Sequence, residues 1–248
     1  MATLFHLKKD DQELMPLFNH AFLENKPIPF PRRSGTQAYS NLFYWAHLEA
    51  FETAEFPLHP HEGFEIMTFV FEGSLEHYDT ASQKYTPVNA GGVQVTQAGS
   101  GVEHSEKIIK GSHLFQIWFD PDFSITLKKQ ATYKDYAAED FSVQTSDGIS
   151  RLTYVGEKGP IYFETPGLGI EKLNFDKGSY CEGLDKDFIY SCYILNGELS
   201  IDDEPIVKDG FVKIENEDRV TFTVPDSAEL FVIKSPAKVG YSKFIDRY

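Results

Sequence analysis

Short hydrophobic runs recur along the whole chain, and each is bordered by Gly, Pro, Asp or Asn. The runs are rich in aromatic and β-branched residues and have the length of a strand. The pattern predicts strands at Asn41–His47, Phe64–Phe71, Ser74–Tyr78, Val93–Thr96, His113–Phe119, Phe188–Leu195, Phe211–Ile214, Val220–Val224 and Leu230–Ile233. Helical spacing is best in two short segments, Asp10–Phe18 and Tyr133–Phe141. We therefore expect an all-β protein of the sandwich or barrel kind with few short helices.

Three sequence matches in the same order indicate two copies of one β module. The matched segments are Glu72–Leu75 with Asn196–Leu199, Pro87–Val93 with Pro205–Phe211, and Ser112–Ile117 with Ala228–Ile233. Each match alone is a generic turn followed by a strand, so the shared order carries the inference. Two domains are therefore predicted, residues 1–130 and residues 131–248, with the chain crossing between them near Pro121–Tyr133.

Composition narrows the range of functions. The 248 residues are 41% hydrophobic and 15% aromatic, and the net charge is −15. Both halves are acidic, so the chain has no basic half to neutralise phosphates, and direct nucleic-acid binding is not expected. Two cysteines suggest no disulfide framework. The first residues lack the features of a signal peptide, and no apolar run approaches 18 residues, so we expect a cytoplasmic protein without a membrane span.

The distribution of histidines is more informative than their number. All eight lie in the first 113 residues, and none follows His113. His59 stands fourteen residues before Gly73, with His61 two further on, whereas the same offsets before Gly197 give Gly183 and Asp185. A histidine-built site is therefore expected in the first module only.

Two pairs of residues could together bind a metal. In an extended chain residues i and i+2 face the same side, so His59 and His61 form one pair, and His104 and Glu106 form another. Pro60, between the first two, suits an edge strand. Three imidazoles and one carboxylate suit a transition metal rather than Ca²⁺ or Mg²⁺. A lone His-x-His is more often a surface or hydrogen-bonded pair, but two such pairs in one module favour a metal site, with two octahedral positions left open.

The central motifs resemble the signature of the pirin family. They are His59–Glu65, Phe71–Gly73, His77–Asp79, Gln94 and Ala98–Glu106. The detailed resemblance covers about Pro57–Trp118, and pirins are bicupins with two jelly-roll β-barrels in tandem. The resemblance implies one Fe(II), or a similar Mn, Ni, Cu, Co or Zn ion, held by His59, His61, His104 and Glu106 in the first barrel. It implies no metal in the second barrel. Because a bicupin already joins two barrels in one chain, a monomer is expected.

Other residues of this region leave alternatives open. Glu65 is a rival for Glu106, because cupins often use the glutamate after His-x-His and because it shares strand parity with His61 if Gly63 introduces no bulge. Glu62 stands where pirins commonly carry Arg, and it places a negative charge beside the site. His77 and Asp79 are expected to support the ligands or the structure, whereas His47 and His113 are expected to be ordinary strand residues and His6 and His20 surface residues. Core aromatics are expected at Phe64, Phe115 and Trp118, and some of them could line an apolar pocket beside the metal.

The resemblance implies two kinds of function. Some pirin-like proteins are oxygen-dependent dioxygenases that cleave flavonols such as quercetin. Glu106 would then leave the metal and accept the proton of the substrate hydroxyl, as the catalytic residue. Other pirins are non-catalytic, iron-dependent modules that bind proteins or act as transcriptional co-regulators, and an acidic surface suits a basic protein partner. A bicupin acting on a different small aromatic substrate is a third alternative, since fold and metal do not fix the chemistry.

Overall fold

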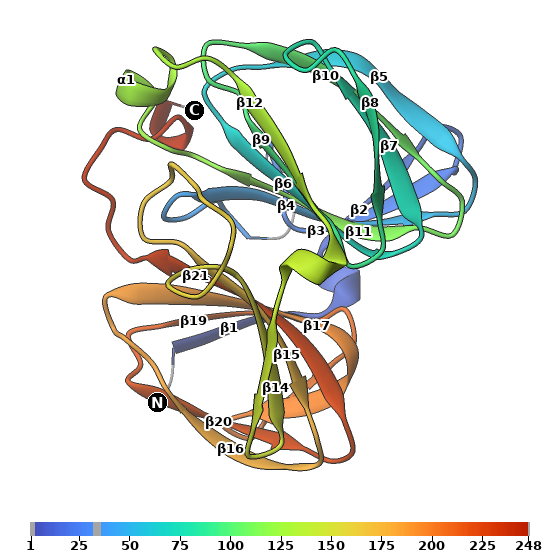
Figure 1. Ribbon diagram of the computed structural model, residues 1–248. Coiled ribbons are helices and arrows are strands. Elements are labelled where there is room, and N and C mark those ends of the chain that lie inside the picture. Colours follow the sequence, from blue (N-terminus) through green and yellow to red (C-terminus); the bar gives the residue numbers. More distant parts are fainter. Residues whose placement is uncertain (1–2, 32–35, 248) are drawn as a thin grey trace. The chain divides into compact units, whose positions relative to one another are not determined.

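The computed structural model describes residues 3–31 and 36–247 (Figure 1). These residues pack into two compact units. The N-terminal barrel comprises Gln12–Asp140 with Tyr241–Tyr248, and the C-terminal barrel comprises Met1–Asp11 with Phe141–Gly240. The first segment of the chain thus belongs to the second barrel, and the last segment belongs to the first. The sequence-based division at residues 130 and 131 stays a prediction.

The N-terminal barrel consists of two sheets. Its seven-stranded sheet has the order β12-β9-β6-β11-β4-β3-β2, and its four-stranded sheet has the order β5-β10-β7-β8. The strands are β2 (Glu13–Leu17), β3 (Phe22–Ile28), β4 (Leu42–Ala50), β5 (Ala54–His61), β6 (Glu65–Glu72), β7 (Ser74–Asp79), β8 (Tyr85–Asn89), β9 (Val93–Gln97), β10 (Val102–Ile108), β11 (His113–Phe119) and β12 (Thr132–Tyr136). The short elements are α1 (Phe123–Thr126) and the 3₁₀ turns η2 (Ala138–Asp140) and η3 (Ile245–Arg247).

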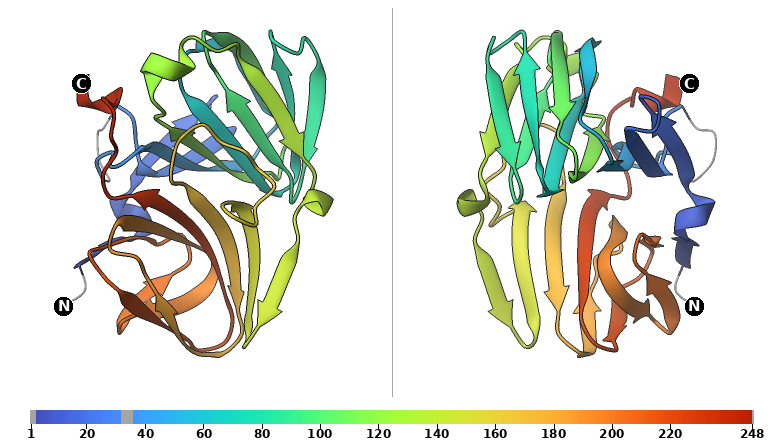
Figure 2. Two further views of the ribbon diagram at one scale, coloured as in Figure 1. Left: turned by 60° about the vertical axis from the view of Figure 1, so that its left-hand side comes forward. Right: turned by 90° about the vertical axis from the view of Figure 1, so that its right-hand side faces the viewer.

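The C-terminal barrel has the order β1-β19-β17-β21-β15-β14-β13 in its main sheet. A second layer pairs β16 with β20, β20 with the end of β17, and β17 with β18. The elements are β1 (Thr3–Leu7), η1 (Lys9–Asp11), β13 (Val143–Ser146), β14 (Ile149–Val155), β15 (Gly169–Phe175), β16 (Gly178–Gly183), β17 (Phe188–Ile201), β18 (Glu204–Val207), β19 (Phe211–Glu215), β20 (Arg219–Val224) and β21 (Ala228–Pro236). Figure 2 shows the strands of each barrel from two further directions.

The two barrels share one topology, strand for strand. β9, β6, β11 and β4 occupy the same places in one sheet as β19, β17, β21 and β15 occupy in the other. Gly73 and Gly197 stand at the same bend with φ of 73° and 74°, a conformation that glycine adopts without strain. The internal repeat is therefore present in the structure. β1 fills the place in the C-terminal barrel that β12 fills in the N-terminal one.

All nine predicted strands are confirmed, whereas both predicted helices are wrong. Asp10–Phe18 contains the turn η1 and the strand β2, and Tyr133–Phe141 contains most of β12 and the turn η2. Pairing overrides the local pattern, because β2 bonds to β3 and β12 bonds to β9 along their whole lengths. The all-β prediction is confirmed.

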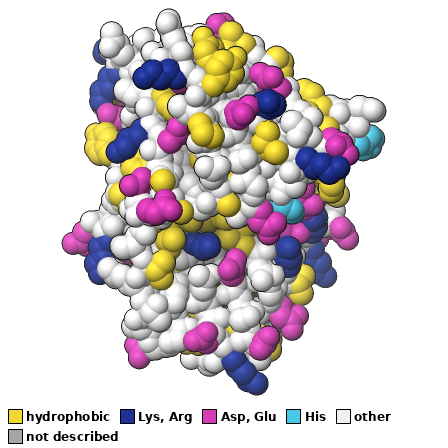
Figure 3. Space-filling view, turned by 45° about the vertical axis from the view of Figure 1, so that its right-hand side comes forward, with side chains coloured by type: hydrophobic (Ala, Val, Ile, Leu, Met, Phe, Trp, Pro, Cys, Tyr) yellow, Lys and Arg dark blue, Asp and Glu magenta, His cyan; other side chains and the backbone are white. Residues whose placement is uncertain are grey.

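Each barrel has its own hydrophobic core. Phe22, Leu48 and Leu114 are buried in the N-terminal barrel, while Ile194 and Leu230 are buried in the C-terminal one. No helix of the described residues is long and apolar enough to cross a bilayer. On the face drawn in Figure 3, acidic and basic side chains are interspersed. That face offers no extended patch of a single charge.

Candidate metal centre

The predicted ligands lie on two neighbouring strands of the four-stranded sheet. β5 and β10 are antiparallel, and His104 stands directly opposite His59 while Val102 stands opposite His61. The register shifts between His104 and Glu106. Each i, i+2 pair keeps its two side chains on one face of its strand. The strand pairing therefore brings together residues that lie 45 positions apart.

Three imidazoles converge on one point. The Nε2 atoms of His59 and His104 lie 2.9 Å apart, and ligand atoms of His59, His61 and His104 all lie within 4.8 Å of one another. Two nitrogens this close can both lie about 2.0–2.1 Å from a single ion. The Nε2 atom of His61 is buried without a hydrogen-bond partner among the described residues. A shared ion would satisfy that orphaned atom, so the residues present fit a metal.

Burial keeps these side chains in the form that binds metals. His104 is fully buried and His61 nearly so. Desolvation, reinforced by His104 and His59, lowers the pKa of His61 to about 3. Desolvation, with a further contribution from His59, lowers the pKa of His104 to about 3. Both imidazoles are therefore neutral at pH 7, and metal binding requires no proton release from them.

Glu106 lines the same pocket as His59, but the opposite sheet holds its carboxylate. Gln116 Nε2 donates to Glu106 Oε2 at 2.8 Å, and Thr68 Oγ1 donates to Glu106 Oε1 at 3.4 Å. Gln116 in turn accepts a hydrogen bond from Trp118 Nε1 at 3.1 Å. The carboxylate stands outside the close group of three histidines. Its assignment as the fourth ligand stays a prediction.

The alternative ligand Glu65 occupies a different setting. β5 ends at His61, β6 begins at Glu65, and Gly63 between them has φ of 79°. Because of this corner, Glu65 does not continue the strand of His59 and His61, so the shared face that made it an alternative ligand is interrupted. Glu65 is buried, and its Oε1 accepts a hydrogen bond from Gln97 at 2.6 Å. Glu62 is exposed to solvent.

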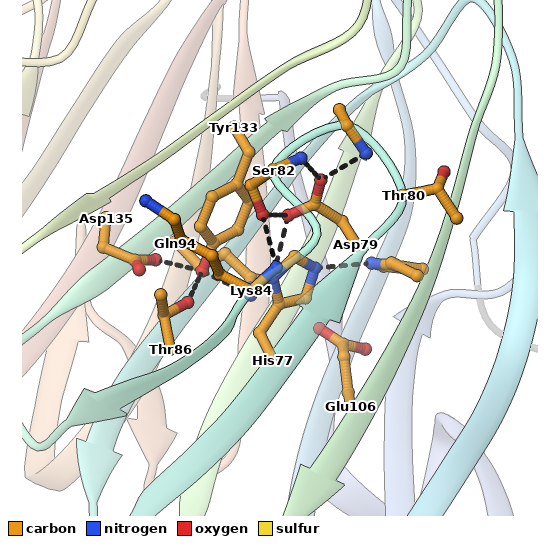
Figure 4. Close-up of polar contacts among 12 residues, drawn as sticks. His77, Asp79, Thr80, Ser82, Lys84, Thr86, Gln94, Glu106, Tyr133 and Asp135 are labelled. Atoms are coloured by element: carbon orange, nitrogen blue, oxygen red, sulfur yellow. Dashed lines mark hydrogen bonds and ion pairs between the residues drawn. The ribbon is translucent and has the colours of Figure 1, made fainter.

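His77 connects the ligands to a polar network behind them. Its Nε2 atom lies 3.2 Å from Nδ1 of His104, and its ring stacks on Tyr133 with centroids 4.2 Å apart and planes 12° apart. Its Nδ1 lies 3.8 Å from Asp79 Oδ2. Asp79 itself accepts hydrogen bonds from the backbone of the next turn, for example from Ser82 N at 2.6 Å. Figure 4 shows the His77 ring beside the Asp79 carboxylate, with Glu106 below it.

The Tyr133 hydroxyl anchors the far side of this network. It donates to Asp135 and lies 2.9 Å from Thr86 Oγ1 and 3.4 Å from Gln94 Nε2. Burial and the hydrogen bond with Asp135 raise the pKa of Tyr133 well above its usual value. The sequence predicted supporting roles for His77 and Asp79. It gave no signal for Tyr133, because β12 meets β9 only through long-range pairing.

A pocket of about 280 Å³ opens beside His59 and Glu106. Aromatic side chains of Phe30, Tyr44 and Trp118 line it. Its wall also contains a buried ion pair in which Lys26 Nζ lies 2.8 Å from Glu24 Oε2. The sequence predicted an apolar pocket near Trp118, but it gave no indication of this ion pair.

Two other histidines also come close together. His47, on β4, and His113, on β11, lie with Glu49 in a second group whose ligand atoms are all within 4.8 Å of one another. His113 stands opposite Glu49 in the strand register. The sequence treated both histidines as ordinary strand residues. They supply a comparison for the first group, because they occupy the other sheet of the same barrel.

Comparison with known proteins relates part of the chain to one family. The family model described as Pirin matches residues 34–119. A pirin-like protein of Caulobacter vibrioides is 33% identical over 131 residues, covering 49% of this chain and 45% of the relative. A crystal structure of the bacterial pirin YhhW from Escherichia coli in complex with nickel(II) covers 95% of this chain and all of its own, with a TM-score of 0.79 and 19% identity. Over residues 34–119 the chain is thus similar to the pirin family.

One relative that carries the name of an enzyme is also similar to this chain. The quercetin 2,3-dioxygenase of Escherichia coli is 43% identical over 70 residues, covering 27% of this chain and 30% of the relative. The chain thus spans less than half the length of these curated relatives. The match to the YhhW structure extends over nearly the whole of this chain and confirms the tandem cupin fold.

Proposed function

We propose that this protein is a metal-dependent dioxygenase acting on small aromatic substrates of the flavonol type, such as quercetin. The observation that carries the proposal is the convergence of three imidazoles, two of them buried and that of His59 half-buried, with an unpartnered Nε2 atom on His61. The dioxygenase name of the Escherichia coli relative supports the reaction class. Fe(II) is the proposed native metal, and the nickel(II) complex of YhhW supports a divalent transition metal.

His59, His61 and His104 would hold the ion, with Glu106 as the fourth ligand. When bound, the metal supplies a Lewis acid and a meeting place for substrate oxygens and dioxygen. Phe30, Tyr44 and Trp118 supply apolar and aromatic contacts to an aromatic ring entering the pocket.

Glu106 is the proposed proton acceptor for the substrate hydroxyl. It is the carboxylate that both faces the pocket and lies next to the histidines, and Gln116 orients one of its oxygens. A group positioned in this way acts as a general base once it is released from the metal. The ion pair of Lys26 with Glu24 compensates both of those buried charges, so neither is needed for proton transfer.

The test combines metal analysis with two assays on one preparation. Oxygen uptake and carbon monoxide release are followed with quercetin on protein loaded anaerobically with Fe(II). The wild type is expected to contain one metal and to consume oxygen, whereas His61→Ala is expected to lose both properties. His20→Asn is the matched control, since His20 is exposed in a turn and belongs to neither group of close ligand atoms, so its replacement should change neither property. Stoichiometric metal without oxygen uptake would reject the enzyme proposal and favour an iron-dependent protein-binding module.

A further inference from the structure

The C-terminal barrel contains a larger cavity than the one beside the histidines. Its volume is about 630 Å³, compared with about 280 Å³ for the pocket at the metal centre. Small-molecule sites typically have volumes of roughly 300–1,000 Å³. All the residues that line this cavity belong to the C-terminal barrel. The proposed dioxygenase reaction makes no use of it.

The cavity is not an emptied copy of the metal centre. Glu106 pairs with His77 in the N-terminal barrel, and Phe222 pairs with Ile201 in the C-terminal one. His77 and Ile201 each follow their bend glycine by four residues, so Phe222 stands at the register position of Glu106. By the same register Val220 replaces His104. Apolar side chains therefore occupy two of the ligand positions, and Glu182, opposite Val220, stands at the position of His59 but is paired with Arg151. With its carboxylate committed in this way, the space suits an organic ligand better than an ion.

One side of the cavity carries a fixed network of charges. Arg151 Nη1 lies 2.5 Å from Glu171 Oε2, and Arg151 Nη2 lies 3.1 Å from Glu182 Oε2. Thr153 Oγ1 donates to Glu171 at 3.0 Å. These contacts join β14, β15 and β16, and the three charged side chains are each about one third exposed. The network holds the wall in place and leaves Arg151 committed to its own carboxylates.

Two further cations line the cavity, and Lys234 is the half-buried one. The other, Lys158, is exposed and donates to Gln144 Oε1 at 3.2 Å. Lys234 Nζ lies 3.8 Å from the ring centroid of Phe188 and 5.8 Å from that of Tyr190. Within residues 3–31 and 36–247, no carboxylate forms an ion pair with this ammonium. The ammonium lies at a cavity whose apolar lining includes Leu173, Leu184, Ile214, Phe222 and Val232. A half-buried cation beside apolar walls favours an anion that carries an apolar body.

We propose that the C-terminal barrel binds a small organic acid with an aromatic or similarly apolar body, its anionic group against Lys234. The apolar walls take up the body of the ligand, and the aromatic rings of Phe188 and Tyr190 flank the anionic end. The site is independent of the metal centre, so it stands or falls separately from the dioxygenase proposal.

The first test compares two fluorescent probes on the metal-loaded, full-length protein. Anilinonaphthalene sulfonate is an aromatic anion, and N-phenylnaphthylamine is a neutral molecule of similar shape. We expect one sulfonate probe to bind per chain, and Lys234→Met to weaken its binding by at least about tenfold while leaving the neutral probe within about twofold. Lys208→Met is the matched control, because Lys208 is exposed in a turn outside the cavity and its replacement should change neither affinity.

The second test locates the bound probe without any substitution. Methyl resonances of Leu184, Ile214 and Val232 should shift as the sulfonate probe is added, because these side chains line the cavity. Methyl groups of Leu75, Ile108 and Leu114 line the metal pocket and should stay unchanged. Shifts confined to that second set, no binding at all, or equal sulfonate affinity in Lys234→Met would each overturn the proposal.

Discussion

The side chain of His77 contacts His104, a proposed metal ligand, from outside the group of three histidines. It lies between Asp79 and His104, and its ring is held flat against Tyr133. Partners of this kind orient a ligating imidazole and set which of its nitrogens carries the proton. Desolvation lowers the pKa of His77 to about 4, so the ring is neutral at pH 7 and can accept or donate one hydrogen bond at each nitrogen.

We predict that His77→Ala weakens metal affinity by about 10–100-fold, the usual effect of losing such a partner. Competition with a chelator of known affinity measures the change, and His20→Asn, at an exposed position outside both histidine groups, serves as the control with wild-type affinity. Tyr133→Phe should have a smaller effect, because it keeps the stacked ring and removes the hydroxyl alone. Wild-type metal affinity in His77→Ala would show that the His104 ring binds the metal equally well without the contact from His77.

Glu106 gives a second prediction, which depends on the proposed dioxygenase activity. Glu106→Gln keeps the size of the side chain and an oxygen that can accept from Gln116 or Thr68, but it removes the basic group. Three imidazoles remain, so we expect most of the metal to be retained. Oxygen uptake with quercetin should fall at least about 100-fold, as expected for a lost general base. Equal losses of metal and turnover would assign Glu106 to metal binding alone.

The sequence could predict the histidines but not everything that supports them. His59, His61 and His104 follow from i, i+2 spacing on strands, a purely local signal. Gln116 and Thr68 could not be found in this way, since they reach Glu106 from the other sheet. The rivalry between Glu65 and Glu106 depended on a single corner, and no spacing rule reveals that β5 ends before Gly63.

That corner separates β5, which carries His59 and His61, from β6, which begins at Glu65. A Cβ atom at Gly63 would lie 2.6–2.9 Å from ring carbons of Phe123, and its φ of 79° strains any other residue. We predict that Gly63→Ala destabilises the protein by roughly 1–3 kcal/mol, measured by urea unfolding. Gly111→Ala is the matched control, with φ of 83° and open space around the new methyl group. A loss no greater than that of the control would exclude the clash with Phe123.

The end of β11 carries a pH-sensitive contact to the last residues of the chain. Asp120 is fully buried, its Oδ2 accepts from Ile245 N at 3.2 Å, and its carbonyl oxygen accepts from the Tyr241 hydroxyl at 2.6 Å. Desolvation raises the pKa of Asp120 to about 6, although backbone hydrogen bonds oppose the shift. The folded protein therefore holds this proton more tightly than the unfolded chain does. The resulting stabilisation is complete below about pH 4 and is lost as the pH rises through about 6.

We predict that Asp120→Asn raises the melting temperature at pH 7.5. At that pH the buried Asp120 carboxylate of the wild type is charged, which lowers the free energy of unfolding by an amount on the order of 1–3 kcal/mol. The difference should shrink at pH 4.5, where the wild-type carboxyl is mostly protonated. Asp226→Asn, at an exposed position, is the control and should be neutral at both values. The same difference at both pH values would contradict the raised pKa of Asp120.

The strands were predictable because alternating apolar residues are a local signal. The two helix predictions were wrong because they used only local spacing, whereas pairing with distant strands decided the structure of those segments. The apolar residues of Asp10–Phe18 fit a short helix, yet the segment gains more by pairing β2 with β3. Chain ends were harder still. β1 pairs with β19, about 200 residues away along the chain, and no local pattern encodes that partner.

For the molecule as a whole, duplication has produced two barrels with different interiors. One contains the histidine group and the other contains Lys234 and the Arg151 network. A metal can therefore stabilise only one of them directly. His59 and His61 lie on β5 and His104 lies on β10, so a bound ion joins those two strands. Their counterparts β16 and β20 carry no histidine.

This asymmetry predicts a one-sided response to metal removal. Binding to the native state stabilises it by about 4 kcal/mol when the free metal is 1,000 times its dissociation constant. Chelation with EDTA should therefore accelerate hydrogen exchange of the β5 and β10 amides by up to about 1,000-fold, while β16 and β20 exchange unchanged. In His61→Ala, β5 and β10 should exchange fast with or without EDTA. Equal acceleration in both barrels would mean that the ion stabilises the molecule through some route other than the β5–β10 pair.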